Sequence, residues 1–299
     1  FHGYDASPAK ADASLYTLMC VDYEVQDEES WYTHSKHLLY QKPKSGYYRF
    51  PVEMGNKHLI RRLQLGQETP IKLSFTQSIR TRTQLAGAMG KKLLLDSAEV
   101  LQRLEDKTYL AQYGLTPETA VCLFIPNTYE VYWTMSADQL FARMHKEYLR
   151  FWNEERRAKA KALGLTPVEV ATLASIVASE TNKTAEHPLI ASLYLNRLNK
   201  GIALQACPTV IFAVGDFKMR RVLKRHLRID SPYNTYTHQG LPPGPIRLAR
   251  PDVIDAVLNA PKTDYLYMCA NPDFSGTHVF SSNYTKHSAV ARQYQRALN

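Results

Sequence analysis

The sequence lacks a long hydrophobic run: its 299 residues contain no stretch of about 18 or more uncharged apolar residues. It also begins without a Met and without the apolar segment of a secretory signal peptide. A membrane-spanning helix is therefore not predicted. We expect a soluble chain, consistent with a processed or truncated form of a longer one.

Cysteine is scarce, and its spacing excludes the usual metal and redox motifs. The four cysteines, Cys20, Cys122, Cys207 and Cys269, form no CxxC or CxxxxC pair. Their even number permits disulfides without favouring them. The ten histidines include no HExxH motif, and the HSKH segment at His34–His37 is interpreted as a solvated face. No metal site is predicted.

Glycine and proline, with 13 and 16 residues, are too few for a collagen-like or low-complexity chain. The hydrophobic share of 44% and the charged share of 22% are typical of a globular protein and exclude disorder. At roughly 150 residues per domain, the length indicates two domains.

Acidic residues are outnumbered, with 28 Asp and Glu against 37 Lys and Arg, which leaves a net charge of +9. This excess favours an anionic partner such as nucleic acid, a membrane surface or an acidic polymer. The basic run Arg156–Lys161 is interpreted as a solvated helix end, where cations complement the helix dipole. It has no interleaved aromatic residues and no nucleic-acid motif, so nucleic-acid binding is not favoured.

The first part of the chain predicts a small strand–helix–strand module. Gly46–Val52 is rich in strand formers, Asn56 is placed to cap a short apolar helix, and Gly66 ends that helix before a second strand at Ile71–Phe75.

The middle of the chain is predominantly helical. We predict helices at Leu85–Leu95 and from Asp96 or Ser97 onward, followed by a loop or short strand at Cys122–Tyr129. Ser136–Gln139 has the form of a capping box, and the helix it begins is predicted to run towards Leu163.

A further capping box, Thr166–Glu169 with Pro at the first helical position, predicts a helix after Gly164. Leu173, Ile176, Val177 and Glu180 follow at i, i+3, i+4 and i+7, so Glu180 shares the apolar face. Burial would raise the pKa of this carboxyl group and keep it protonated near neutral pH, as a general acid requires. The alternative is that the helix ends near Ser179 and Glu180 reaches solvent or caps a neighbouring element.

A second helix is predicted from Pro188 to just before Gly201. Its polar pair Asn196–Arg197 either faces the site or is solvated, and the pattern favours the solvated position. Two stretches dense in turn residues follow, Leu204–Ile211 and then Ser231–Tyr236 with Gly240–Pro245. Their amide, hydroxyl and aromatic side chains are typical of a carbohydrate-binding groove, although turn formation alone also explains the prolines and glycines.

Only one carboxylate after Gly164 lies on an apolar stripe, and it is Glu180. Ordinary glycosidases use two carboxylates, and no second partner is evident. The nine carboxylates in this part of the chain are Glu169, Glu180, Glu186, Asp216, Asp230, Asp252, Asp255, Asp264 and Asp273.

A series of motifs covers essentially all of Leu165–Asn299. They are LASIVASET (Leu173–Thr181), IASLYLNRL (Ile190–Leu198), LQACPTVIFAVGD (Leu204–Asp216), SPYNTY (Ser231–Tyr236), GLPPGPI (Gly240–Ile246), KTDYLYMCA (Lys262–Ala270) and HVFSSNYTKH (His278–His287). In type and order they resemble the endolytic murein transglycosylase family, also called MltG or YceG-like. Upstream, GYYRF (Gly46–Phe50) and FIPNTYEVYWTMSAD (Phe124–Asp138) are similar to the family as well.

The resemblance implies an α+β fold with two parts. A small LysM-like α/β module that contacts glycan is expected at residues 1–76, and a mixed, helix-rich catalytic region at residues 77–299. Within that region a helical connecting part, 77–163, precedes the catalytic core, 164–299.

The resemblance also implies a lyase: a peptidoglycan lytic transglycosylase that cleaves the β-1,4 bond between N-acetylmuramic acid and N-acetylglucosamine without water and leaves a 1,6-anhydro-muramoyl end. The family's catalytic glutamate corresponds to Glu180, which would serve first as acid and then as base, so a second carboxylate is unnecessary. No metal or organic cofactor is implied. The residues expected to bind substrate are Gln205, Thr209, Tyr233, Asn234, Thr235 and Tyr236.

The chain departs from the family pattern in two ways. Where the family usually has Gln-x-Asp-Pro-Thr, this chain has Cys207 in the place of the Asp. That change motivates an alternative function, a non-catalytic peptidoglycan-binding or scaffold protein that retains the fold. The family's N-terminal membrane anchor is also missing, so we expect this sequence to be a soluble portion of a longer protein.

The resemblance further implies where and with what the protein works. Nascent glycan strands are the expected substrate, and peptidoglycan synthases are expected partners. The expected location is the bacterial cell envelope, at the periplasmic face of the inner membrane.

Overall fold

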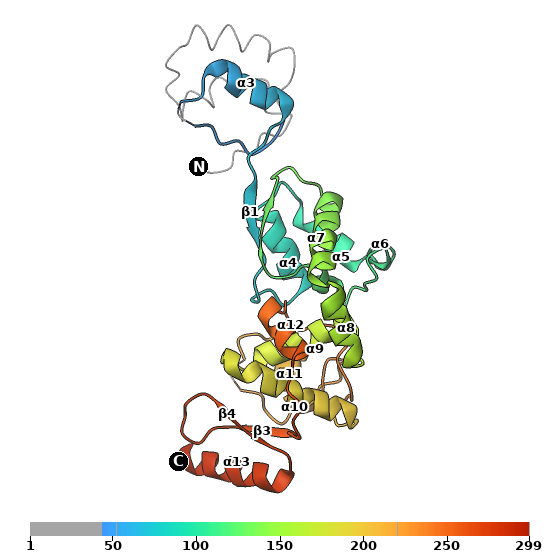
Figure 1. Ribbon diagram of the computed structural model, residues 1–299, viewed down its shortest axis with the longest axis vertical. Helices are drawn as coiled ribbons and strands as arrows, with labels where there is room; N and C mark the ends of the chain where they lie inside the picture. Colours follow the sequence, from blue (N-terminus) through green and yellow to red (C-terminus); the bar gives the residue numbers. More distant parts are fainter. Residues whose placement is uncertain (1–43, 52, 220, 299) are drawn as a thin grey trace. The chain divides into compact units, whose positions relative to one another are not determined.

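The computed structural model describes residues 44–51, 53–219 and 221–298 (Figure 1). The chain forms two compact units, each made of several stretches that are not continuous in the sequence. One contains the described residues up to Ser74 together with Ala86–Val100 and Thr128–Leu140, and the other contains Phe75–Leu85, Leu101–Asn127 and Phe141–Asn299. The fold is a helix-rich α+β fold with two small sheets, which confirms the predicted class.

In the first unit, the helix α3 (Asn56–Leu65) packs Leu59, Ile60 and Leu63 against Tyr48, Phe50 and Met54. The predicted end at Gly66 is confirmed, since its φ of 67° is one that L-residues rarely adopt. The predicted cap at Asn56 is wrong: Gly55 occupies that position, and Asn56 is the first helical residue.

The predicted strand–helix–strand module is also wrong in its pairing. Residues 46–51 form no strand, although Thr69 N donates to Tyr47 O at 2.7 Å. Strand β1 (Ile71–Ser74) pairs antiparallel with β2 (Thr128–Val131), with Leu73 opposite Tyr129. The strand partner therefore comes from more than 50 residues along the chain, which local patterning did not indicate. The LysM-like assignment of residues 1–76 stays a prediction, because residues 1–43, including Cys20 and His34–His37, lie outside the described residues.

Of the two helices predicted between these strands, the first is shorter than predicted and the second is as predicted. α4 (Arg82–Gly90) ends at Gly90 rather than at Leu95, whereas α5 (Ser97–Glu105) begins where expected, with Asp96 Oδ1 accepting from Ala98 N. Two further short elements follow, α6 (Lys107–Ala111) and the 3₁₀ turn η1 (Ala120–Leu123).

The long helix predicted from Ser136 towards Leu163 is two helices. Ser136 and Gln139 exchange the expected capping bonds at the start of α7 (Ala137–Phe151). Asn153 then starts α8 (Glu154–Ala162), because its side chain accepts from Arg156 N at 3.0 Å. The helix is interrupted at the buried Trp152, and the Asn153 side chain then accepts from the backbone amide of Arg156.

Four helices form the core of the second unit: α9 (Pro167–Glu180), α10 (His187–Asn199), α11 (Cys207–Val214) and α12 (Pro251–Leu258). Figure 1 shows them grouped together, with α9 packed against the other three. The capping box at Thr166, the N-terminal Pro188 and the turn at Gly201 are all as predicted. α9 is buried along nearly its whole length, from Val170 to Ala178.

A hairpin completes this unit. Strands β3 (Tyr267–Ala270) and β4 (His278–Ser281) pair antiparallel and contact α13 (Tyr284–Leu298), which has no buried residue (Figure 1). The 3₁₀ turn η2 (Thr184–Glu186) directly precedes α10, and the 3₁₀ turn η3 (His226–Arg228) follows α11.

Among the described helices, none alone combines the length and the hydrophobicity required to cross a membrane. The pair α8 and α9, bent by 77°, meets that requirement when its two helices are taken together.

The capping box at the start of α9 should contribute measurably to stability. Thr166→Ala removes the hydroxyl that accepts from Glu169 N, and we expect it to lower the free energy of unfolding by about 1 kcal/mol. Denaturant titration measures the change. Glu169→Gln, which keeps an acceptor for Thr166 N, should cost less, and an equal or larger loss in that variant would contradict the assignment.

Candidate functional site

Glu180 is the last residue of the buried helix α9, and its side chain is half-buried. The hydroxyl of Tyr194, from the facing helix α10, donates to Glu180 Oε1 at 2.5 Å. Tyr194 is only 2% exposed. The helix therefore does not end at Ser179, and Glu180 reaches a tyrosine hydroxyl inside the fold rather than open solvent.

Burial raises the pKa of the Glu180 carboxyl group above its usual range. The hydrogen bond from Tyr194 and the charge of His278 lower this pKa, but burial is the larger effect. Burial and the neighbouring Glu180 carboxylate likewise raise the pKa of Tyr194 well above its ordinary value. Tyr194 thus remains a proton donor to Glu180, and burial favours the protonated form of the Glu180 carboxyl group more than solvent would.

Arg197, one turn after Tyr194 on α10, ties three segments together. Its guanidinium donates to Ala203 O at 2.9 Å, Leu266 O at 2.8 Å and Gln205 Oε1 at 2.8 Å. Arg197 is 7% exposed, so the expectation of a solvated Asn196–Arg197 pair is wrong. Asn196 is half-buried and donates to Thr263 O and Tyr265 O, because the helix face that carries both residues packs against other parts of the chain.

Gln205 and Cys207 lie exposed at the start of α11, beside Tyr236. Gln205 adopts a φ of 53°, and its backbone N donates to Thr235 O. Cys207 Sγ lies 3.2 Å from the Tyr236 hydroxyl. Although Cys207 is exposed as a residue, its thiol is partly shielded from solvent, which raises the pKa of the thiol; the hydrogen bond with Tyr236 opposes this rise and the charge of Glu180 adds to it.

Tyr236 also interacts electrostatically with Glu180 and Arg197. The structure therefore brings Glu180, Gln205 and Tyr236 to one place, together with Tyr194, Arg197 and Cys207.

Three other predicted site residues are buried instead of exposed. Thr209 and Thr235 are buried and share a hydrogen bond of 2.8 Å between their hydroxyl oxygens. Asn234 is buried, and its side-chain amide donates to Leu227 O and Ile229 O. These contacts fix the course of the loop that carries Tyr236. Tyr233 is half-buried against Phe212, with ring centroids 4.7 Å apart.

A buried carboxylate that the sequence did not single out lies near the hairpin. Glu186 is 8% exposed, and its two oxygens accept from His278 N at 2.6 Å and contact His278 Nδ1 at 3.0 Å. This pair connects β4 to the start of α10. His278 is also the residue whose charge lowers the pKa of Glu180.

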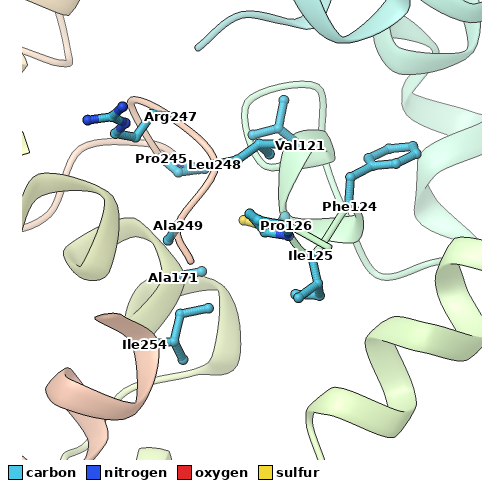
Figure 2. A pocket seen from close by; sticks show the side chains of 11 residues that line it. Val121, Phe124, Ile125, Pro126, Ala171, Pro245, Arg247, Leu248, Ala249 and Ile254 are labelled. Carbon is cyan, nitrogen blue, oxygen red and sulfur yellow. The ribbon is translucent and has the colours of Figure 1, made fainter. Parts of the chain in front are cut away.

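An apolar pocket of about 10 Å³, enough for roughly one water molecule, lies elsewhere in the same unit (Figure 2). Val121, Phe124, Ile125 and Leu248 are among its lining residues, and none of the predicted site residues belongs to it. In the described part of the chain, no three His, Cys, Asp or Glu side chains are grouped so that they could hold a metal ion.

A model of the YceG-like family matches residues 18–293. The chain belongs to this family. The resemblance noted in the sequence is thereby confirmed, and it extends over both units of the fold.

Curated relatives of this YceG-like chain carry the name endolytic murein transglycosylase. The protein from Bacillus subtilis strain 168 is 28% identical over an alignment of 291 positions that covers 92% of this chain and 79% of that protein. The protein from Streptococcus pneumoniae strain D39 is 27% identical over an alignment of 302 positions that covers 89% of this chain. The chain spans about half the length of the pneumococcal relative, 53%.

The crystal structure of a yceG-like protein from Listeria monocytogenes, lmo1499, resembles this YceG-like chain with a TM-score of 0.64. The two are 26% identical, and the match covers 92% of this chain and 93% of that one.

Arg197 should be important for stability. Arg197→Met leaves the carbonyls of Ala203 and Leu266 without their donor, and we expect the free energy of unfolding to fall by about 3 kcal/mol. Chemical denaturation measures the loss, with Lys200→Met, an exposed cation at the end of the same helix, as the control. Equal stability of the two variants would contradict a structural role for Arg197.

Glu180→Gln should stabilise the protein in a pH-dependent way. A folded-state pKa above the unfolded value means that the wild-type stability falls as the pH rises from the usual glutamate range through the raised pKa. Glutamine does not ionise, so the melting temperature of the variant should exceed that of the wild type at about pH 8, and the difference should shrink towards about pH 4. A difference that is constant with pH would contradict the raised pKa.

Proposed function

We propose that this chain is a peptidoglycan lytic transglycosylase in which Glu180 acts first as general acid and then as general base. The observation that carries the proposal is the half-buried Glu180 carboxyl group, held by Tyr194 in a setting that raises its pKa. The names of the relatives from Bacillus subtilis and Streptococcus pneumoniae support the reaction class.

In the first step, the protonated Glu180 donates its proton to the glycosidic oxygen between N-acetylmuramic acid and N-acetylglucosamine. The bond from that oxygen to muramoyl C1 breaks, and the N-acetylglucosamine leaves as an alcohol. The positive charge that develops at C1 is stabilised by the newly formed Glu180 carboxylate or by the acetamide of the muramoyl ring.

In the second step, the Glu180 carboxylate removes the proton of the muramoyl 6-hydroxyl, and O6 forms a bond to C1. The product is the 1,6-anhydro ring, no water is consumed, and Glu180 regains its proton. A single carboxyl group therefore serves both steps. Glu186 is unsuited to be a second acid or base, because both of its oxygens are engaged by His278.

The other predicted residues fall into two roles in this proposal. Gln205, Tyr233 and Tyr236 are exposed or half-buried and would contact the glycan. Thr209, Asn234 and Thr235 are buried in hydrogen bonds and would hold the loop in position. The location at the periplasmic face of the inner membrane, the membrane anchor, the synthase partners and the preference for nascent strands belong to the same proposal.

Cys207 favours one competing function, a peptidoglycan-binding protein without catalysis. Its thiol, hydrogen-bonded to Tyr236 beside Glu180, stands where the resemblance leads us to expect an aspartate. If that aspartate is needed for activity, the wild-type chain binds sacculi without cleaving them and Cys207→Asp restores cleavage.

Digestion of purified sacculi followed by mass spectrometry of the released fragments tests the proposal. The wild type should release anhydro-ended fragments, and Glu180→Gln should reduce their rate of release by about 10²- to 10⁴-fold, because the proton donor is lost. Glu169→Gln makes the same chemical change on the same helix, in its capping box, and should retain activity. Undiminished activity of Glu180→Gln, or reducing ends in place of anhydro ends, would overturn the assignment.

A further inference from the structure

A strongly basic segment lies between α11 and the loop that carries Tyr236. We call Lys218–Arg228 the basic segment. Its 11 residues contain six of the Lys and Arg residues of the chain and no Asp or Glu. Five of these cations are within the described residues, and all five are exposed: Lys218, Arg221, Lys224, Arg225 and Arg228.

No carboxylate of the described residues forms an ion pair with any of these five cations. The basic run on α8 differs, since Arg156 pairs with Asp255 at 2.7 Å and Lys159 pairs with Glu155 at 2.7 Å. The nearest acidic residues in the sequence, Asp216 and Asp230, lie just beyond the two ends of the segment. Like charges gathered without ion-pair partners repel one another, and an anionic ligand would relieve that repulsion.

The basic segment is attached to the proposed substrate loop at both ends. At its far end, the buried Asn234 side chain donates to Leu227 O at 3.1 Å and to Ile229 O at 2.9 Å. At its near end, Phe217 lies 6.1 Å from Phe212, whose ring also packs against Tyr233. Both ends of the basic segment are therefore held next to the loop that carries Tyr233 and Tyr236.

We propose that the basic segment binds the carboxylates of the peptide stems carried by the glycan strand. This inference rests on the proposed function, in which the glycan lies along Tyr233 and Tyr236. The sugars themselves offer little charge, whereas the stems offer carboxylates at regular intervals. Because a stem is covalently joined to a sugar that is already bound, its effective concentration at the basic segment is high.

Other anionic partners fit the segment less well. The described residues of the basic segment contain the three-residue turn η3 but no amphipathic helix, which binding at a lipid surface favours. It contains no Phe, Tyr or Trp on which a nucleic-acid base could stack.

Binding of the intact chain to two forms of soluble glycan strands tests the proposal. One form keeps its stem carboxylates, and the other has them converted to neutral amides with a carbodiimide and ammonia. The test variant is Lys218→Gln/Arg221→Gln/Lys224→Gln. The control is Lys91→Gln/Lys92→Gln/Lys161→Gln, which removes the same charge at other exposed positions.

At roughly two-fold per exposed charge pair, the test variant should bind the carboxylate strands about eight-fold more weakly than the wild type. The control variant should change little, and all three proteins should bind the amidated strands alike. Added salt should remove the difference between the test variant and the wild type.

Equal binding of the test and control variants to the carboxylate strands would overturn the proposal. So would an equal loss on both kinds of strand, or a loss confined to vesicles of anionic phospholipid. The measurement needs no cleavage. A protein that binds as predicted but releases no anhydro ends would therefore contradict the proposed function and still support the binding of stem carboxylates by the basic segment.

Discussion

The buried guanidinium of Arg197 is the contact on which the arrangement of the site depends. It lies one turn from Tyr194 on α10 and donates to the segment before α11, to Gln205 and to the strand segment that leads into β3. Its charge also lies 5.7 Å from the centre of the Tyr267 ring. A buried cation with this many fixed acceptors cannot shift without leaving polar groups unsatisfied. Arg197 thus links Gln205 and the segment before the hairpin to α10, the helix whose Tyr194 donates to Glu180.

The surroundings of Glu180 determine how readily its carboxyl group ionises. The apolar face of α9 is buried up to Ala178, so the carboxyl group at the end of that helix enters a poorly solvated region. It also lies at the C-terminal end of α9, where the helix dipole disfavours a negative charge. Tyr194 supplies a hydrogen bond that supports the ionised form, and burial outweighs it. A group balanced in this way can lose and regain a proton at one site, which the proposed two-step reaction requires.

Local signals in the sequence predicted much of the fold. The capping boxes at Ser136 and Thr166 and the proline at Pro188 each act through neighbouring residues, and the structure has them as predicted. Asn153 was missed because an amide within a run of helix formers is easily taken for an interior residue. The pairing of β1 with β2 was missed because its two strands are far apart in the chain.

The same distinction between local signals and contacts far apart in the chain applies to the site. Helical periodicity placed Glu180 on the buried face, since that argument needs only residues of one helix. Arg197 was misinterpreted because two of its acceptors are backbone carbonyls, one of them 69 residues away, and no sequence pattern marks a carbonyl. Tyr194 gave no polar signal, because a tyrosine in an apolar stripe looks like an ordinary core residue. The burial of Glu186 depends on His278, 92 residues away.

The central claim is that Glu180 directs the muramoyl 6-hydroxyl, and not water, to C1. Digestion of glycan strands in water labelled with a heavy oxygen isotope tests it most directly, with the isotope content of the new chain ends read by mass spectrometry. The account predicts anhydro ends that carry no label, because every oxygen at the new end comes from the substrate. Reducing ends that contain the heavy isotope at C1 would contradict it.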